Sequence, residues 1–418
     1  MKVAIVCDSM SAFGGAERVV AHILQIFPDA DLFSVLDVVP AGQRGFLEGR
    51  TVRTSFLQKL PKIERYYRKL LYLWPLAVEQ LDVTAYDLVI SSHHSVAYGV
   101  LTRPGQVHVS YVHSPMRYAW DLQHEYLRSA RLDRGLLGMV ARTMLHKLRV
   151  WDYAAAQRPD AIAANSHFVA ERLLKTHRRR STVIHPPVAL ASPDARERAA
   201  RRRRSGRAGY YLSLGRLVPY KRVDLLALAF ARMPHRSLKI VGDGPDLGKI
   251  AALGAPNVEI LGYQPEDRVR DFIAGAEAYL FAGIEDFGIT AVEAQALGTP
   301  VIAYRAGGLA ETVVGLHHPS PTGLFFAEQS EEAVVSAIEA FETNRRAFTP
   351  AACIANAERF SAHRFRDAFS GFVEDAITAT RDASAATGVL CEPPRVPPRT
   401  VPEPVAVAPA DPVVGGVL

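Results

Sequence analysis

The segment EDFGITAVEAQALGTPVIAY, residues 285–304, constrains the fold more than any other stretch of the chain. Its pattern is a loop, a helix rich in small residues, a Gly-Thr-Pro turn and an apolar strand, which is typical of an alternating α/β fold. Gly288 lets a ligand approach the backbone closely, and the free N–H groups of the helix start form an anion site. Glu293 lies one turn into the helix, where its carboxylate can accept hydrogen bonds from paired hydroxyls such as those of a ribose. The segment therefore suits a sugar nucleotide, with Glu285 near the sugar.

Two glutamates eight residues apart are common, and a solvated helix face is the alternative explanation. The helix, however, also carries Ala291, Ala294 and Leu297 beside Glu293. These apolar neighbours favour a packed helix with an inward-facing carboxylate.

Strand and helix patterns alternate through both halves of the chain. In the first half, strands are predicted at 2–7, 31–36, 87–91, 107–112 and 159–168. In the second half, they are predicted at 209–214, 238–242, 258–261, 278–282 and 323–326. This alternation predicts an α/β protein of two Rossmann-like domains, each with a parallel, doubly wound sheet. The ligand cleft is then expected between the domains, beyond the carboxyl ends of the strands.

Composition excludes several classes of protein. The 418 residues are 49% hydrophobic and 22% charged, which is ordinary for a soluble globular chain. Cys7, Cys353 and Cys391 are odd in number and far apart, so they give neither a disulfide framework nor a metal site. A reducing, cytoplasmic compartment is the expectation. No window approaches the roughly 18 apolar residues of a membrane span, and the first apolar run is too short for a signal peptide.

Two segments carry much of the formal charge of +6. The first, FLQKLPKIERYYRKLLYLWPLAV at 56–78, mixes basic and aromatic residues and can lie on an anionic membrane surface, such as the inner face of the cell membrane. A surface helix that packs its apolar side on its own domain is the alternative. The second, RERAARRRRSGR at 196–207, is predicted to be a solvated, mobile linker or loop. Nucleic-acid binding is disfavoured because no recognition module surrounds this run.

Basic and glycine-rich turns follow two strands of the second half. Arg216 and Lys221 lie five residues apart across a turn, where Arg can chelate two phosphate oxygens while Lys supplies a point charge. A surface turn is the alternative for this pair. Gly242 and Asp243, in VGDGP, lie between a strand and a helix and resemble a nucleotide-binding loop, although a tight turn explains them equally well.

The first half offers two further clusters. Gly15 and Glu17, in GGAE, open a helix whose N–H groups can face a phosphate, and Glu17 could alternatively serve as a cap. The sequence YVHSPMRYAWD leaves an apolar strand and breaks at a proline, which places His113 at the carboxyl end of that strand. Its polar and aromatic residues predict a sugar-binding lip, formed by Arg117, Tyr118, Trp120 and Asp121. His93 and His94 occupy a similar strand end.

These motifs together resemble the retaining glycosyltransferases of family 4, which have the GT-B fold. The resemblance extends to about residue 380, with GGAE, the histidine of YVHSP, NSHFV, GRLVPYK, VGDGP and the Glu-x7-Glu pair in the family's order. It implies an acceptor-side domain at 1–190, a donor domain at 208–362 and a helix at 363–381 that packs back on the first domain. The Pro/Val/Ala-rich stretch 382–418 is expected to be a disordered tail.

The resemblance also implies roles for the matched residues. His113 and Glu285 would lie at the reaction centre. The donor would be held by Gly15, Arg216, Lys221, Gly242, Asp243, Phe287, Gly288, Ile289, Thr290 and Glu293. The acceptor lip would be Glu17, Arg117, Tyr118, Trp120 and Asp121. No metal and no cofactor are expected, because cations and helix ends stabilise the leaving diphosphate in such enzymes.

A narrower resemblance concerns YVHSPMRYAWD and the 56–78 region. Both look like those of bacterial O-antigen mannosyltransferases, which implies a GDP-mannose donor and a saccharide or polyprenyl-linked acceptor. A UDP-sugar or another GDP-sugar remains open as the donor, and a nucleotide-sugar epimerase remains open as the enzyme class. The expected location is the cytoplasm, with peripheral attachment to the inner face of the membrane.

Overall fold

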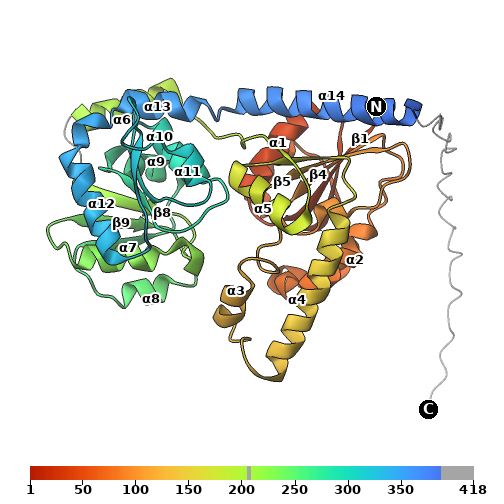
Figure 1. Ribbon diagram of the computed structural model, residues 1–418, viewed down its shortest axis with the longest axis horizontal. Helices are drawn as coiled ribbons and strands as arrows, with labels where there is room; N and C mark the ends of the chain where they lie inside the picture. The colour runs from red at the N-terminus through yellow and green to blue at the C-terminus, as the bar shows by residue number, and fades with distance from the viewer. Residues whose placement is uncertain (205–208, 387–418) are drawn as a thin grey trace, which may run out of the picture.

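Buried apolar runs form the strands of two parallel sheets. The computed structural model describes residues 1–204 and 209–386, and Figure 1 shows them as two α/β units side by side. In β1 (Val3–Met10) seven of the eight residues are buried, because helices cover both faces of its sheet. Within each sheet, neighbouring strands pair in parallel.

The N-terminal sheet has the order β3-β2-β1-β4-β5-β6-β7. Its remaining strands are β2 (Asp31–Asp37), β3 (Val52–Thr54), β4 (Leu88–His93), β5 (Val107–Val112), β6 (Ala161–Ala164) and β7 (Thr182–Val183). Its α-helices are α1 (Gly15–Ile26), α2 (Trp74–Glu79), α3 (Gln123–Ser129), α4 (Gly135–Ala155) and α5 (His167–His177). Short 3-10 helices are η1 (Ala41–Leu47), η2 (Phe56–Lys59), η3 (Ile63–Arg65), η4 (Tyr67–Leu73) and η5 (Ala97–Gly99).

The C-terminal sheet has the order β10-β9-β8-β11-β12-β13. Its strands are β8 (Tyr210–Leu214), β9 (Ser237–Val241), β10 (Val258–Gly262), β11 (Tyr279–Phe281), β12 (Val301–Tyr304) and β13 (Gly323–Phe326). Its helices are α6 (Pro193–Arg204), η6 (Pro219–Lys221), α7 (Val223–Ala231), α8 (Leu247–Ala251), α9 (Glu266–Gly275), α10 (Ile289–Ala296), α11 (Leu309–Thr312), α12 (Glu331–Thr343), η7 (Arg345–Ala347) and α13 (Pro350–Glu358). In both sheets the strand order reverses beside the first strand, at β1/β4 and at β8/β11, and ligands bind open α/β sheets at such points.

The last helix, α14 (Ala362–Ala386), returns to the N-terminal unit, along whose upper edge it lies in Figure 1. Phe365, Phe369 and Val373 are buried in the same core as β1 and α1. The predicted return of this helix is therefore confirmed. α14 extends to Ala386, so residues 382–386 are helical and the prediction that the tail begins at 382 is wrong for them; residues 387–418 lie outside the described part of the chain.

The Arg-rich run is helical where the structure describes it. α6 packs on α9, and Ala195 and Ala199 are buried with the C-terminal core. The prediction of a solvated linker or loop is wrong for 196–204, because two alanines four residues apart give this helix an apolar side among its arginines. The C-terminal unit thus includes chain that precedes residue 208, where the donor domain was predicted to begin.

The 56–78 segment folds as η2, η3, η4 and the start of α2, rather than as one helix. Leu57, Ile63 and Trp74 are buried in the core on the other face of the N-terminal sheet, and Tyr66 and Tyr67 pack partly against it, whereas Phe56 and Tyr72 are exposed. The alternative of packing on its own domain therefore describes most of the apolar side chains of this segment.

Candidate active site

A cavity of about 420 Å³ lies between the two units at the carboxyl ends of the strands. It brings together nine of the residues predicted for the site. They are Gly15, His113, Lys221, Glu285, Phe287, Gly288, Ile289, Thr290 and Glu293. Arg18, Asn165, Tyr279 and Asp286, which the sequence analysis did not assign to the site, also line it.

Two helix N-termini face each other across this cavity. α10 begins after Gly288, whose φ of 88° is in the left-handed region, and no side chain caps the helix. A Cβ atom at Gly288 would lie 2.5 Å from Leu309 Cδ1, so both conformation and space require glycine. α1 begins opposite, and a Cβ at Gly15 would come within 2.9 Å of the Ile289 side chain. Two helix dipoles thus direct partial positive charge into one space, which favours an anion there.

Two ion pairs add full charges to the same cavity. Lys221 Nζ lies 2.9 Å from Glu285 Oε1, and Arg18 Nη1 donates to Glu293 Oε1 at 2.7 Å. Burial acts to lower the pKa of Lys221, but the Glu285 carboxylate outweighs burial and raises that pKa, so the ammonium is charged. The Arg18–Glu293 pair joins α1 to α10 and therefore spans the two units.

His113 follows β5 and is fixed by three hydrogen bonds. Its ring Nε2 lies 2.8 Å from Ser92 Oγ, its N–H donates to the carbonyl of His93 and its carbonyl accepts from the Asn165 amide at 2.8 Å. Burial lowers the pKa of His113 to about 3, with the nearby His94 adding to that effect. The imidazole is therefore neutral at physiological pH.

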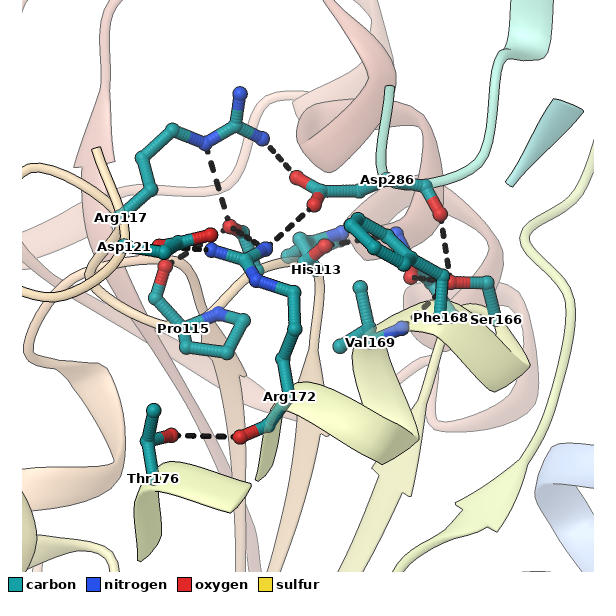
Figure 2. Close-up of polar contacts among 12 residues, drawn as sticks. His113, Pro115, Arg117, Asp121, Ser166, Phe168, Val169, Arg172, Thr176 and Asp286 are labelled. Atoms are coloured by element: carbon teal, nitrogen blue, oxygen red, sulfur yellow. Dashed lines mark hydrogen bonds and ion pairs between the residues drawn. The ribbon is translucent and has the colours of Figure 1, made fainter. Parts of the chain in front are cut away.

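Asp286 of the C-terminal unit is held by two arginines of the N-terminal unit (Figure 2). Its carboxylate pairs with Arg117 and with Arg172 Nη1, the latter at 2.7 Å, and its carbonyl accepts from Ser166 Oγ at 2.6 Å. Glu311 makes a second link, because its carboxylate accepts from the N–H of His167 and of Phe168 at 2.9 and 2.8 Å. The first turn of α5 is thus capped by a side chain of the other unit.

A second cavity of about 660 Å³ adjoins the first and shares Asp286 with it. Arg117 and Asp121, two residues of the predicted acceptor lip, line it together with side chains of α3, α5 and α8. Arg117 also stacks over the ring of Tyr220, with 5.2 Å between its guanidinium carbon and the ring centre. This cavity offers both charges and an aromatic face next to the predicted donor site.

The structure does not bring every predicted residue to these cavities. Trp120 donates its indole N–H to buried Asp152 at 2.7 Å, and Tyr118 hydroxyl bonds to Ser95 at 2.8 Å. Both rings pack on the N-terminal core and neither lines either cavity, so the structure does not bring these two residues of the predicted acceptor lip to the interdomain site. After Pro115, the side chains of Tyr118, Ala119 and Trp120 face the core while those of Arg117 and Asp121 face the cavity, a division that the sequence alone does not indicate.

Four more predicted residues lie away from these cavities, and three of them serve the local structure. Glu17 accepts from the N–H of Gly14 at 3.1 Å and so caps α1, the alternative explanation left open for it. Gly242 crosses the loop after β8 so closely that a Cβ would lie 1.9 Å from the Gly215 carbonyl oxygen. Asp243 accepts from the N–H of Gly244 at 2.6 Å, and the Arg216 side chain is exposed beside this loop. None of these four, including Arg216, lines the two interdomain cavities.

A buried carboxylate supports the loop behind His113. Asp8, at the end of β1, accepts from the N–H groups of residues 94–97 and lies 3.0 Å from the ring of His94. Burial opposes ionisation of Asp8, but His94 and these N–H groups hold its pKa well below the usual range. In return, Asp8 raises the pKa of His94, although desolvation acts to lower it; the His94 side chain is still 42% exposed. Asp8 was not identified from the sequence; the signal that could have found it is a carboxylate within the apolar run of β1.

Among the described residues there is no group of three or more His, Cys, Asp or Glu side chains placed to hold a metal ion. In the same part of the chain, no helix combines the length and hydropathy required to cross a bilayer.

Two facing Rossmann-like units with an anion-attracting cleft between them define the GT-B class of α/β proteins. The family model described as Glycosyltransferase Family 4 matches residues 13–192, and the model described as Glycosyl transferases group 1 matches residues 195–360. The chain therefore belongs to the GT-B glycosyltransferases of family 4 type, and the predicted family and fold are confirmed.

Individual relatives match part of the chain. The D-inositol 3-phosphate glycosyltransferase of Mycobacterium sp. strain KMS is 34% identical over 178 residues, 38% of this chain and 40% of that protein. The GDP-mannose-dependent alpha-(1-6)-phosphatidylinositol monomannoside mannosyltransferase of Mycolicibacterium smegmatis is 29% identical over 198 residues, 42% of this chain and 50% of that protein. The chain thus spans between two fifths and half the length of these curated relatives.

Solved structures show the same fold. Anabaena HepE in complex with UDP superposes with a TM-score of 0.63 and 18% sequence identity, over 90% of this chain and 100% of that one.

Proposed function

We propose that this protein is a retaining glycosyltransferase that moves a hexose from a nucleotide sugar to a saccharide or lipid-linked saccharide. The observation that carries the proposal is the pair of helix N-termini, those of α1 and α10, that face one cavity containing Lys221, Arg18 and Glu293. Such a space suits a diphosphate flanked by a ribose-binding carboxylate. The family of the chain and the names of its relatives agree with this reading.

In the proposed complex the donor diphosphate lies between the two helix starts. Its oxygens accept from the N–H groups of Ile289 and Thr290, and Lys221 supplies a full positive charge. Glu293 accepts from the ribose hydroxyls, and Glu285 holds the sugar while orienting Lys221. No divalent metal is required in this arrangement, because these groups offset the charge of the leaving group.

The proposed chemical step breaks the bond between the anomeric carbon and the diphosphate oxygen. The acceptor hydroxyl forms its bond to that carbon on the same face, and its proton passes to the departing phosphate oxygen. No protein nucleophile takes part. His113 remains a neutral imidazole, since its pKa is about 3, and it lines the centre as a hydrogen-bonding group rather than as a charged acid.

For the donor we propose GDP-mannose first, with a UDP-sugar or another GDP-sugar next. A relative is named as GDP-mannose-dependent, whereas HepE is a structure in complex with UDP, so both nucleotides have precedents among similar proteins. For the acceptor we propose a glycan of the cell envelope, bound in the larger cavity beside Arg117 and Asp121. The proposed location is the cytoplasm, which suits Cys7, a buried free cysteine.

A thermal-shift screen of GDP-, UDP- and dTDP-sugars tests the donor, followed by an assay of product with and without a saccharide acceptor. The proposal expects stabilisation by one nucleotide class and release of that nucleoside diphosphate only when acceptor is present. Conversion of the donor sugar without any acceptor would identify an epimerase instead. Stabilisation by none of these nucleotides, with tight salt-dependent binding to DNA, would overturn the proposal.

A further inference from the structure

The start of α4 exposes a cluster of large apolar side chains. Leu136 is 77% exposed, Leu137 74%, Met139 57% and Val140 49%. Gly138, which lies between these residues, is buried. A Cβ atom at Gly138 would lie only 2.6 Å from the Leu132 carbonyl oxygen. Leucine and methionine side chains exposed to this degree in neighbouring positions mark an interaction surface rather than chance.

Helical spacing gathers these side chains on one side. Leu136, Val140 and Met144 are four residues apart and lie one above another, with Leu137 beside them. Further along the helix, Leu148 is buried in the N-terminal core. The apolar side of α4 is therefore largely exposed at the start of the helix and packs on the domain further along.

Figure 1 shows where this surface lies. α3 and α4 form a hairpin that projects away from the N-terminal sheet, and the first turn of α4 is at its tip. α3 also forms one wall of the 660 Å³ cavity through Glu125 and Arg128, together with its N-cap residue Leu122. The exposed cluster and the proposed acceptor cavity therefore belong to the same hairpin.

The surroundings of the cluster are basic. Between residues 123 and 150 the chain has six Lys or Arg and two Asp or Glu. Arg131, Arg134 and Arg142 are exposed next to the apolar side chains, and the side chain of Arg134 is 94% exposed. One of the two acidic residues, Asp133, lies 3.7 Å from Arg134, and its carbonyl accepts from Arg142. Apolar side chains rimmed by arginines are complementary to the hydrocarbon boundary and the anionic headgroups of a membrane.

Charge argues against a second copy of the chain as the occupant. In a twofold dimer this surface would face itself, so its arginines would meet arginines. The 56–78 segment is a weaker membrane surface than its sequence indicates, because its Leu57, Ile63 and Trp74 are buried within the domain. Its exposed apolar side chains, those of Phe56, Tyr72 and Leu76, are 40–50% exposed, less than Leu136 and Leu137.

We propose that the tip of the α3–α4 hairpin is a docking surface for an anionic lipid bilayer. Leu136, Leu137 and Val140 enter the headgroup boundary, and Arg131 and Arg134 contact lipid phosphates. This orientation holds the acceptor cavity next to the membrane, where a lipid-linked saccharide would be presented. Only this last step rests on the proposed function, since vesicle binding requires neither donor nor acceptor.

Sedimentation of the full-length protein with vesicles tests the surface. We expect binding to vesicles that contain phosphatidylglycerol and weaker binding to phosphatidylcholine alone. L136D/L137D should weaken binding by about tenfold or more, because each exposed leucine would lose its apolar burial. R131E/R134E should remove the preference for phosphatidylglycerol. The matched control is L76D, which changes a leucine of the 56–78 segment that is 50% exposed and should bind like the wild type.

Thermal unfolding and transfer to a soluble acceptor check that each variant is intact. Wild-type binding to neither vesicle, or L136D/L137D binding like the wild type, would overturn the docking surface. Loss of binding in L76D alone would assign the membrane contact to 56–78. Conversion of a dimer to a monomer by L136D/L137D, with vesicle binding unchanged, would make the surface a self-association site. Vesicle binding that depends on Leu136 and Leu137 without any transfer activity would leave the surface standing and reject the proposed function.

Discussion

Arg18 of α1 and Glu293 of α10 lie 2.7 Å apart, Nη1 to Oε1, and they connect the two units directly across the candidate donor cavity. Their separation in sequence is 275 residues, so nothing local suggests the contact. Glu293 is the residue that we propose to hold the ribose. The donor ribose must therefore share the Glu293 carboxylate with Arg18 or displace Arg18 from it. A displaced Arg18 guanidinium can turn to the diphosphate.

Arg18→Ala is expected to raise the KM for the donor about tenfold. Freeing Glu293 from this ion pair, whose side chains are 21% and 28% exposed, gains about 1 kcal/mol, whereas a charge-assisted hydrogen bond to phosphate is worth about 1.5–3 kcal/mol, so the loss outweighs the gain. Initial rates at varied donor concentration measure it, with Arg18→Lys as the control that keeps the charge. A lower KM in Arg18→Ala would show that Arg18 only competes with the ribose.

Lys221→Ala is expected to lower kcat by about a hundredfold or more, since it removes the full charge that faces the leaving diphosphate. Glu293→Ala should reduce transfer as severely through donor binding. Both variants should keep the far-ultraviolet circular dichroism of the wild type, because neither side chain belongs to a buried core. Full transfer activity in either variant would reject the assigned donor site.

Asp286→Ala is expected to loosen the contact between the two units. It leaves Arg117 and Arg172 without their shared carboxylate, and removing one partner of a largely buried pair costs about 3 kcal/mol. Small-angle scattering should show a larger radius of gyration in the absence of donor. Glu358→Ala, which removes an exposed pair with Arg196 within the C-terminal unit, is the control. An unchanged radius in Asp286→Ala would show that other contacts set the arrangement.

The alternation of apolar strands with helices was sufficient to predict two Rossmann-like domains, because buried parallel strands are continuous apolar runs bounded by turns. The α10 loop was equally clear, since Gly288 and Glu293 are fixed by local geometry. Residues that act across the cleft were not predictable. Arg18 and Asp286 acquire their ion-pair partners, and Arg172 acquires Asp286 in addition to Asp121, only when the two sheets face each other. A lone charged residue in a sequence carries no sign of such a partner.

Side-chain direction was the second limit. In the YVHSPMRYAWD segment, Arg117 and Asp121 reach the interdomain cavity while Tyr118 and Trp120 pack inward. Aromatic residues next to polar ones fit a sugar-binding lip and a domain core equally well. The exposed leucines of α4 escaped notice for the converse reason, because an apolar helix pattern normally indicates burial.

The Asp8–His94 pair predicts how stability depends on pH. Asp8 raises the pKa of His94 in the folded protein above its ordinary value of 6.5. The contribution of this histidine is therefore fully present below pH 6.5 and is lost as pH rises through the folded pKa. Urea unfolding of the wild type and of His94→Gln should show a stability difference that is largest near pH 6 and narrows toward pH 9. NMR titration of the His94 ring gives the folded pKa directly.

His363, whose ring is exposed beside Asp367, supplies the control through His363→Gln, which should show little pH-dependent difference. A constant difference between wild type and His94→Gln across this range would mean that His94 acts through packing rather than through charge.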